Sequence, residues 1–367
     1  MSASEPTLAK VCTSTFSPLG AYRIWRPLLF RLAPERAHHL SLRALECASH
    51  FTWSRRCLAQ LYAPRSTSYT PRSLWGHTVH TPLGLAAGYD KGARALEGLT
   101  ALGLGHIEVG TVTPRPQSGN SGVRVKRLKP QRALVNRLGF PSEGMEIVAQ
   151  RLERFRQKRE ETSYIETTRS PTPMIGVNLG KNRSTPNHQA HEDYLKLIKR
   201  LGPYADYVVV NISSPNTPQL RALQGRDALS RLLDPLLNAR ETTSAAHGGR
   251  LPLVVKLAPE FKEASLEDTL QIIIEANVDG VILANTQRVA TPLPGGLSGA
   301  PLFNQTLRLI KQARAYAPHL ILIASGGIGS RAQVDELLSA GADLVQVWTA
   351  LIYRGPQLIR ALSETQD

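Results

Sequence analysis

Eight short apolar runs, each ending in polar or glycine residues, constrain the fold of this chain more than any other feature. The clearest run is Tyr207–Asn211, which passes directly into the polar, proline-containing segment Ile212–Pro218. The other seven runs begin at Leu83, His106, Met174, Leu253, Gly280, Leu320 and Leu344. Continuous apolar runs of this length are typical of parallel strands, because both faces of a parallel sheet are covered.

Helix-like segments lie between the runs, and Ser330 and Gly341 are a predicted helix N-cap and helix stop. The alternation predicts an α/β fold, either a (β/α)8 TIM barrel or a doubly wound open sheet. We favour the barrel because all eight runs end in polar or glycine residues, whereas an open sheet would use only a few. The clearest predicted helices are Glu192–Leu201, Leu266–Ala276, Leu307–Ala317 and Arg331–Ala340.

Bulk properties exclude several classes of protein. The 367 residues include only three cysteines, Cys12, Cys47 and Cys57, which argues against a disulfide framework or a metal site. No apolar stretch reaches the ~18–20 residues that a membrane span needs. The net charge of +15 fits nucleic acid, an anionic membrane surface, anionic ligands or simply a solvated basic surface.

The amino-terminal segment is predicted to form two short amphipathic helices, separated by a turn at Ala33–Arg36. Such helices suit a membrane interface, although they could instead cover the bottom of the barrel. At an interface, the apolar side chains would face lipid and the arginines would lie near phosphates. We therefore divide the chain into a helical, membrane-associating segment, residues 1–65, and a barrel domain, residues 66–367. The apolar side chains that would face lipid are Trp25, Leu28, Leu29 and Phe30, and the arginines that would lie near phosphates are Arg23, Arg26 and Arg31.

The strand ends carry groups for an anionic, polar ligand. The loop Ser325–Ser330 follows the seventh run and contains three glycines, which suits a phosphate held by backbone N–H groups. Lys256 ends the fifth run and could form a Schiff base or place charge beside a cofactor ring. Lys91 follows the first run and could face the same ligand or pair with Asp90 at the surface.

Asparagines cluster at the predicted barrel mouth: Asn178, Asn211 and Asn285 end runs, and Asn136, Asn182 and Asn216 lie in adjoining loops. Their amides donate and accept, so several of them together would recognise a planar imide-like ring. No histidine ends a run, and the run ends offer no carboxylate pair, which disfavours hydrolysis. A phosphate-anchored cofactor that carries its own chemistry is more consistent.

From about Arg31 to Pro356, the chain resembles the dihydroorotate dehydrogenases of the membrane-associated, quinone-using class. The motifs that carry the resemblance are Leu85–Lys91, Glu108–Gln117, Asn136–Phe140, Gly176–Asn182, Asn211–Thr217, Gly295–Gly299, Arg354–Pro356 and, near the amino terminus, Ala33–His38.

The resemblance implies oxidation of (S)-dihydroorotate to orotate in pyrimidine synthesis, with FMN as hydride acceptor and a membrane quinone as final acceptor. It implies that Ser214 is the catalytic base and that no metal takes part. The implied substrate residues are Lys91, Asn136, Arg137, Leu138, Gly139, Phe140, Asn211, Asn216, Asn285 and Thr286. The implied FMN residues are Ala87, Gly88, Thr111, Asn178, Asn211, Lys256, Ala284, Gly299, Gly326, Gly327, Trp348 and Thr349, and a quinone tunnel would contain His38 and Arg127.

Trp348, Ala324-Ser325 and Ala284 depart from the family pattern, which has tyrosine, Gly-Val and threonine there. The resemblance also implies a peripheral protein of the bacterial inner membrane, on its cytoplasmic side, or alternatively of the mitochondrial inner membrane. Two other hypotheses remain: a Schiff-base aldolase or another phosphate-binding barrel, and an RNA-directed flavin barrel or a basic nucleic-acid-binding protein. Neither explains the Asn211–Thr217 motif, and we expect no nucleic acid partner.

Overall fold

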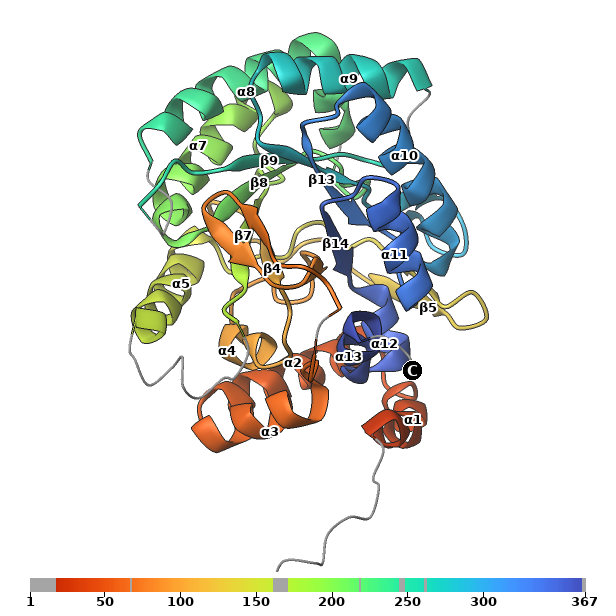
Figure 1. Ribbon diagram of the computed structural model, residues 1–367. Helices are drawn as coiled ribbons and strands as arrows, with labels where there is room; N and C mark the ends of the chain where they lie inside the picture. The colour runs from red at the N-terminus through yellow and green to blue at the C-terminus, as the bar shows by residue number, and fades with distance from the viewer. Residues whose placement is uncertain are drawn as a thin grey trace, which may run out of the picture.

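The computed structural model describes residues 18–66, 68–160, 171–217, 219–243, 248–260 and 263–364. Its centre is a closed barrel of parallel strands, in the order β10-β13-β14-β3-β4-β7-β8-β9 (Figure 1). Each of the eight apolar runs forms one of these strands, which confirms the predicted (β/α)8 fold. The strands are β3 (Leu83–Leu85), β4 (His106–Val112), β7 (Met174–Leu179), β8 (Tyr207–Asn211), β9 (Leu253–Lys256), β10 (Gly280–Leu283), β13 (Ile321–Ser325) and β14 (Leu344–Val347).

Helices surround the barrel, and the four predicted helices are present with ends within three or four residues of those expected. Ser330 caps α11 with a capping box, and Gly341 beyond its end has a φ of 104°, as a helix stop requires. The helices are α4 (Leu96–Thr100), α5 (Met145–Glu160), α7 (Ala190–Leu201), α8 (Arg226–Glu241), α9 (Glu263–Glu275), α10 (Phe303–Tyr316), α11 (Arg331–Ser339), α12 (Thr349–Arg354) and α13 (Gln357–Ser363), with 3-10 turns at Asn187–Gln189, Gly202–Tyr204, Leu220–Gln224 and Ala300–Leu302.

Strand alternation divides the core into two clusters and decides which side chains reach the site. In β8, Val208 and Val210 belong to the larger cluster, which extends to the surrounding helices. Tyr207 and Val209 belong to the smaller cluster, which the barrel strands share. Because successive side chains alternate between the two faces of a strand, Asn211 lies on the same face as Tyr207 and Val209. The position of Asn211 at the barrel mouth therefore follows from strand period alone.

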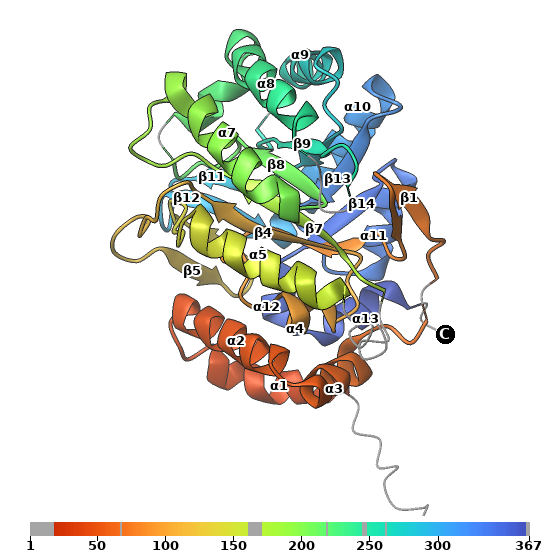
Figure 2. The ribbon, with the colours of Figure 1, turned by 90° about the vertical axis from the view of Figure 1, so that its left-hand side faces the viewer.

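Antiparallel strands that the sequence did not predict cover the two ends of the barrel (Figure 2). The hairpin β1 (Arg72–Leu74) and β2 (His77–Val79) packs Leu74 and Val79 against the first residues of the barrel strands, such as Met174 and Tyr207. At the opposite end, four strands form a sheet in the order β11-β12-β6-β5. Their bounds are β5 (Val125–Leu128), β6 (Ala133–Asn136), β11 (Gln287–Val289) and β12 (Gly295–Gly299).

The amino-terminal segment contains three described helices, not two: α1 (Pro18–Leu29), α2 (Pro34–Ser49) and α3 (Thr52–Tyr62). They form a layer beside α4, α12 and α13, whereas the β1–β2 hairpin closes the amino-terminal end of the barrel (Figure 2). The alternative of helices covering the bottom of the barrel is therefore wrong.

Trp25 and Leu28 are exposed as expected, but three other side chains of this segment face the protein. Leu29 lines a cavity, the ring of Phe30 packs 5.5 Å from that of Tyr353, and Arg26 donates to the carbonyl of Tyr353 at 3.0 Å. We predicted that Leu29 and Phe30 face lipid and that Arg26 lies near phosphates. This prediction is wrong, because these three side chains lie on the side of the segment that packs against α12.

Candidate active site

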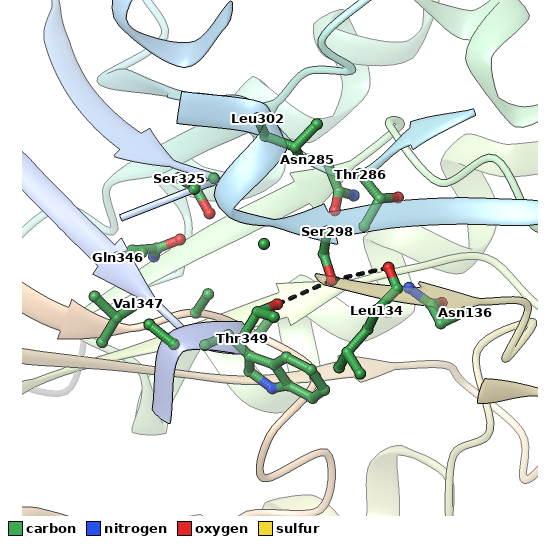
Figure 3. Close-up of a pocket in the computed structure, with 18 of the residues that line it drawn as sticks. Leu134, Asn136, Asn285, Thr286, Ser298, Leu302, Ser325, Gln346, Val347 and Thr349 are labelled. Carbon is green, nitrogen blue, oxygen red and sulfur yellow. Dashed lines mark hydrogen bonds between the residues drawn. The ribbon is translucent and has the colours of Figure 1, made fainter. Parts of the chain in front are cut away.

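A cavity of about 440 Å³ opens at the carboxyl ends of the barrel strands, under the antiparallel sheet. Figure 3 shows side chains from several elements around one space: Asn285 and Thr286 on one side, Asn136 and Leu134 on another, and Gln346, Val347 and Thr349 opposite. The cavity also contains Ser214, Lys91 and Lys256 among its lining residues. The strand ends that the sequence marked as polar therefore meet at one site.

Most predicted site residues line this cavity. Of the predicted substrate residues, Arg137 alone is absent from the lining; of the predicted cofactor residues, Asn178 and Ala284 are absent. Arg137 uses its backbone instead, donating to the carbonyl of Arg124 at 2.7 Å. Asn178 and Ala284 are buried just behind the lining. Asn182 is not part of the asparagine cluster, because it bonds to Arg115 and Gln117 in a neighbouring loop.

Ser214 follows β8 and is 5% exposed, with its Oγ accepting a hydrogen bond from the backbone N–H of Asn216 at 3.2 Å. The side chain of Asn216 donates to Asn136 Oδ1 at 3.1 Å, which joins the β8 loop to the antiparallel sheet. Arg221 holds the same loop from behind by donating to the carbonyls of Ser213 and Thr286, both at 2.8 Å. The Ser214 hydroxyl is therefore fixed at the cavity wall.

Lys91 lies at the end of the cavity nearest the amino-terminal helices. Its Nζ donates to the carbonyl of Gly88 at 2.7 Å, and burial lowers its pKa to about 8. Asp90, the alternative partner, accepts instead from the backbone N–H groups of Arg94 and Ala95. Lys91 is therefore a partly buried ammonium group without an ion-paired carboxylate among the described residues, and an anionic ligand would supply one.

The glycine-rich loop before α11 forms another end of the cavity. Gly326 and Gly327 have φ values of 130° and 81°, which other residues rarely adopt, and both line the cavity. Two arginines that the sequence analysis did not select, Arg132 and Arg354, line the same cavity. Burial, and then the nearby charge of Arg132, lower the pKa of Arg354. This end of the cavity suits a phosphate.

A buried carboxylate, Glu108, lies behind the cavity and was also missed. It stands in the middle of β4, is 0% exposed, and accepts from Lys256 Nζ at 3.4 Å and from Gln346 Nε2 at 2.5 Å. Two sequence signals point to it: Glu108 begins the motif Glu108–Gln117, and it is a charged residue inside an otherwise apolar run, which must be paired when buried. Lys256 is thus ion-paired from behind while it lines the cavity in front.

A second cavity, of about 690 Å³, lies between the barrel and helices α1 and α2. Both predicted tunnel residues, His38 and Arg127, line it. Burial and the nearby Lys91 lower the pKa of His38 to about 3, so its ring is neutral at physiological pH. The two cavities share lining residues and are therefore neighbours; the shared residues are Lys91, Val125, Leu134, Leu138, Pro141 and Trp348.

Comparison with known proteins gives a consistent result. The family model of dihydroorotate dehydrogenase matches residues 70–365. A relative from Acidithiobacillus ferrooxidans, named dihydroorotate dehydrogenase (quinone), is 44% identical over 357 residues, covering 94% of each chain. A relative of the same name from Dichelobacter nodosus is 42% identical over 93% of this chain and 97% of its own. A solved structure of DHODH from Eimeria tenella in complex with ferulenol has a TM-score of 0.76 and 33% identity, covering 91% of this chain and 92% of that chain.

Proposed function

The chain belongs to the dihydroorotate dehydrogenase family, and on that premise we propose which of its residues bind the cofactor, the substrate and the quinone. It is an oxidoreductase of pyrimidine synthesis that oxidises dihydroorotate to orotate, with FMN as cofactor and a quinone as the final electron acceptor. This function replaces the two alternatives, an aldolase and an RNA-directed protein. Lys256 supports it too, because its Nζ is held in an ion pair with Glu108 at 3.4 Å, which suits a fixed cation beside a cofactor ring.

The first cavity has the groups that FMN requires. One buried atom of a lining residue, Trp348 Nε1, has no hydrogen-bond partner among the described residues, so a polar ring would satisfy it. Lys256 supplies a cation for the ring, and the glycine loop with Arg354 suits the phosphate. FMN bound there supplies hydride acceptance. In this proposal, FMN is held by the predicted cofactor residues that line the cavity.

The substrate occupies the part of the cavity between Ser214 and Lys91. Lys91 binds the carboxylate of dihydroorotate, since its ammonium group lines the cavity and its only described hydrogen bond is to a carbonyl. Asn136, Asn216 and Asn285 supply amides to the N–H and C=O groups of the ring. Ser214 removes the acidic ring proton as general base and passes its own hydroxyl proton on to water. The observation that carries this assignment is the convergence of these side chains on one cavity.

The direct test of the proposed function is spectroscopic. Purified protein should carry a yellow flavin that loses its colour anaerobically when dihydroorotate is added. Ketone or aldehyde substrates of aldolases should leave the spectrum unchanged. Protein that binds no flavin after incubation with FMN, or whose flavin is inert to dihydroorotate, would contradict the proposal.

Binding of orotate should weaken as the pH rises through the pKa of Lys91. That pKa is lowered to about 8 by burial, so the ammonium form dominates below pH 8 and the neutral form above it. Affinity should therefore be constant at low pH and fall by about tenfold per pH unit well above 8. Orotate titrations followed by the flavin spectrum from pH 6.5 to 9.5 measure this. Lys91→Arg keeps its charge and should show no such decline; a flat wild-type profile would exclude the assignment.

We propose that the second cavity is the quinone passage. It is lined by apolar side chains of α1 and α2, contains a neutral His38, and adjoins the first cavity at Trp348 and Leu138. A hydrophobic quinone needs such an apolar route between the bilayer and the flavin. Arg127 donates to the carbonyl of Leu32 at 2.7 Å and stacks over Phe30, so it fixes the carboxyl end of α1 at the cavity entrance.

A quinone acceptor associates the reaction with a membrane, and residues 1–65 are the proposed contact with it. Among the described residues, no helix is long and apolar enough to cross a bilayer. Of the twelve exposed large apolar side chains in the described part of the chain, eight nevertheless fall in or beside α1–α3, including Trp25, Phe51 and Trp53. Together with exposed arginines such as Arg23 and Arg43, they suit the anionic cytoplasmic face of a bacterial inner membrane.

Replacing Trp25 and Trp53 by aspartate should weaken binding to vesicles of anionic phospholipid by at least about tenfold, because two exposed aromatic anchors are lost. Their exposed fractions are 60% and 67%. Vesicle co-sedimentation measures the effect. Ile147→Asp is the matched control, since Ile147 is 41% exposed on α5, outside this layer. Equal loss in both variants would mean that charge alone matters, and unchanged binding in the double variant would place the membrane contact elsewhere.

A further inference from the structure

Glu108 stands at the centre of a buried polar network. The reaction outlined above gives Glu108 itself no role. Three side chains donate to its carboxylate: Asn178 Nδ2 at 2.5 Å, Gln346 Nε2 at 2.5 Å and Lys256 Nζ at 3.4 Å. Glu108 and Asn178 are 0% exposed, and Gln346 and Lys256 are 2% and 3% exposed. A carboxylate removed from water to this degree persists only with such partners.

Because a carboxylate only accepts, Glu108 determines which way the neighbouring amide points. Asn178 turns its amino group to Glu108, and so its Oδ1 accepts from Asn211 Nδ2 at 2.9 Å. Asn211 then presents its Oδ1 to the hydroxyl of Ser213 at 2.8 Å. Ser213 Oγ in turn accepts from Asn285 Nδ2 at 2.7 Å.

The direction of this chain of hydrogen bonds has a consequence at the cavity wall. Asn285 uses one N–H of its amino group on Ser213, and this bond fixes the side on which its carbonyl oxygen, Oδ1, lies. Asn285 therefore offers a ligand Oδ1 as an acceptor for a ring N–H, beside its second N–H. The order runs from Glu108 through Asn178, Asn211 and Ser213 to Asn285, and every member except Glu108 could point either way on its own.

We propose that Glu108 is a positioning residue with two effects: it orients this hydrogen-bond chain, and it holds Lys256 as the charge-compensated cation behind the flavin. The inference rests on the proposed function. Glu108 touches neither substrate nor flavin and acts through Lys256 and Asn178. Its negative charge offsets part of the field that Lys256 exerts on the cavity, so the flavin responds to the pair and not to the lysine alone.

Measuring the flavin reduction potential in Glu108→Gln, Lys256→Met and the double variant tests the charge compensation. Lys256→Met leaves an uncompensated carboxylate near the ring, so its potential should be the lowest of the four proteins and its FMN dissociation constant at least about tenfold higher than that of wild type. Glu108→Gln should raise the potential. The double variant should recover part of the loss, with a higher potential and tighter FMN binding than Lys256→Met.

Recovery in the double variant would show that Glu108 acts through its charge. If Glu108 only supported the fold, the double variant should bind FMN more weakly than either single variant. A double variant whose potential is no higher, and whose FMN dissociation constant is no lower, than those of Lys256→Met would overturn the proposal. If Glu108→Gln does not fold, the comparison of Lys256→Met with the double variant still decides it. Glu97→Gln is the control: Glu97 pairs with Lys158 at 2.8 Å outside the cavity, and its loss should leave the potential unchanged.

The orientation of the chain is tested by orotate affinity. A glutamine at position 108 can donate as well as accept, so Asn178 and the residues beyond it lose their fixed direction, and orotate should bind at least about fivefold more weakly to Glu108→Gln. Unchanged orotate affinity would exclude the orienting effect. Wild-type protein that binds neither FMN nor orotate would instead contradict the proposed function, so the two failures are distinguishable.

Discussion

Ser214→Ala should retain FMN but reduce it with dihydroorotate about 10²–10⁴-fold more slowly, which is the usual contribution of a general base. The hydroxyl stands at the wall of the first cavity and makes one described hydrogen bond, from the N–H of Asn216. Asn216 keeps its bond to Asn136 when that contact is lost, so the loop should stay in place. Anaerobic stopped-flow measurement of flavin bleaching gives the rate.

Ser298→Ala is the matched control for this variant. Ser298 lines the same cavity, but its hydroxyl accepts from Thr349 Oγ1 at 2.9 Å and is part of the antiparallel sheet. Its loss should change the reduction rate by less than about tenfold, in keeping with the net value of one hydrogen bond. A cysteine at position 214 should restore part of the rate, because a thiol can also act as a base. Bleaching of Ser214→Ala at the wild-type rate would remove this serine from the proton transfer.

The sequence was informative about the barrel for a physical reason. Parallel strands covered on both faces are continuous apolar runs, and their carboxyl ends meet at one mouth. The ends of β8 and β10 thus identified Asn211 and Asn285 before any coordinates were known. The antiparallel sheet gave no such signal, because strands such as β5 (Val125–Leu128) and β12 (Gly295–Gly299) are short and rich in charge or glycine.

Glu108 and Arg354 illustrate what reading the strand ends cannot find. Glu108 lies within its strand, two positions before Gly110. Its hydrogen-bond partners come from β7 and β14, which lie beside and across from β4 in the folded barrel. Arg354 reaches the cavity from the end of α12, well beyond the eighth strand. Both positions depend on closure of the barrel, which brings together residues that are far apart in the sequence. Strand alternation could have placed the Glu108 side chain inside, but not its partners.

Filling the second cavity should separate the two halves of the reaction. Ala37 lies on α2 and lines this cavity, so Ala37→Trp places an indole ring in the proposed quinone passage. The indole ring would exclude the quinone from the cavity, so kcat/KM for a soluble quinone should fall by up to about a hundredfold, which is ~3 kcal/mol of transition-state binding. Dihydroorotate enters the first cavity, so anaerobic bleaching of the flavin should proceed at close to the wild-type rate.

Leu40→Trp distinguishes a blocked passage from a general disturbance of α2. Leu40 is 52% exposed, lies three residues further along the same helix and is not among the described residues that line the cavity. Its replacement should leave both rates near those of wild type. Equal loss of quinone turnover in the two variants would point to a change in how α2 meets the membrane. Full turnover in Ala37→Trp, with folding and flavin content intact, would show that the quinone reaches the flavin by another route, because an indole ring and a quinone cannot occupy the same space.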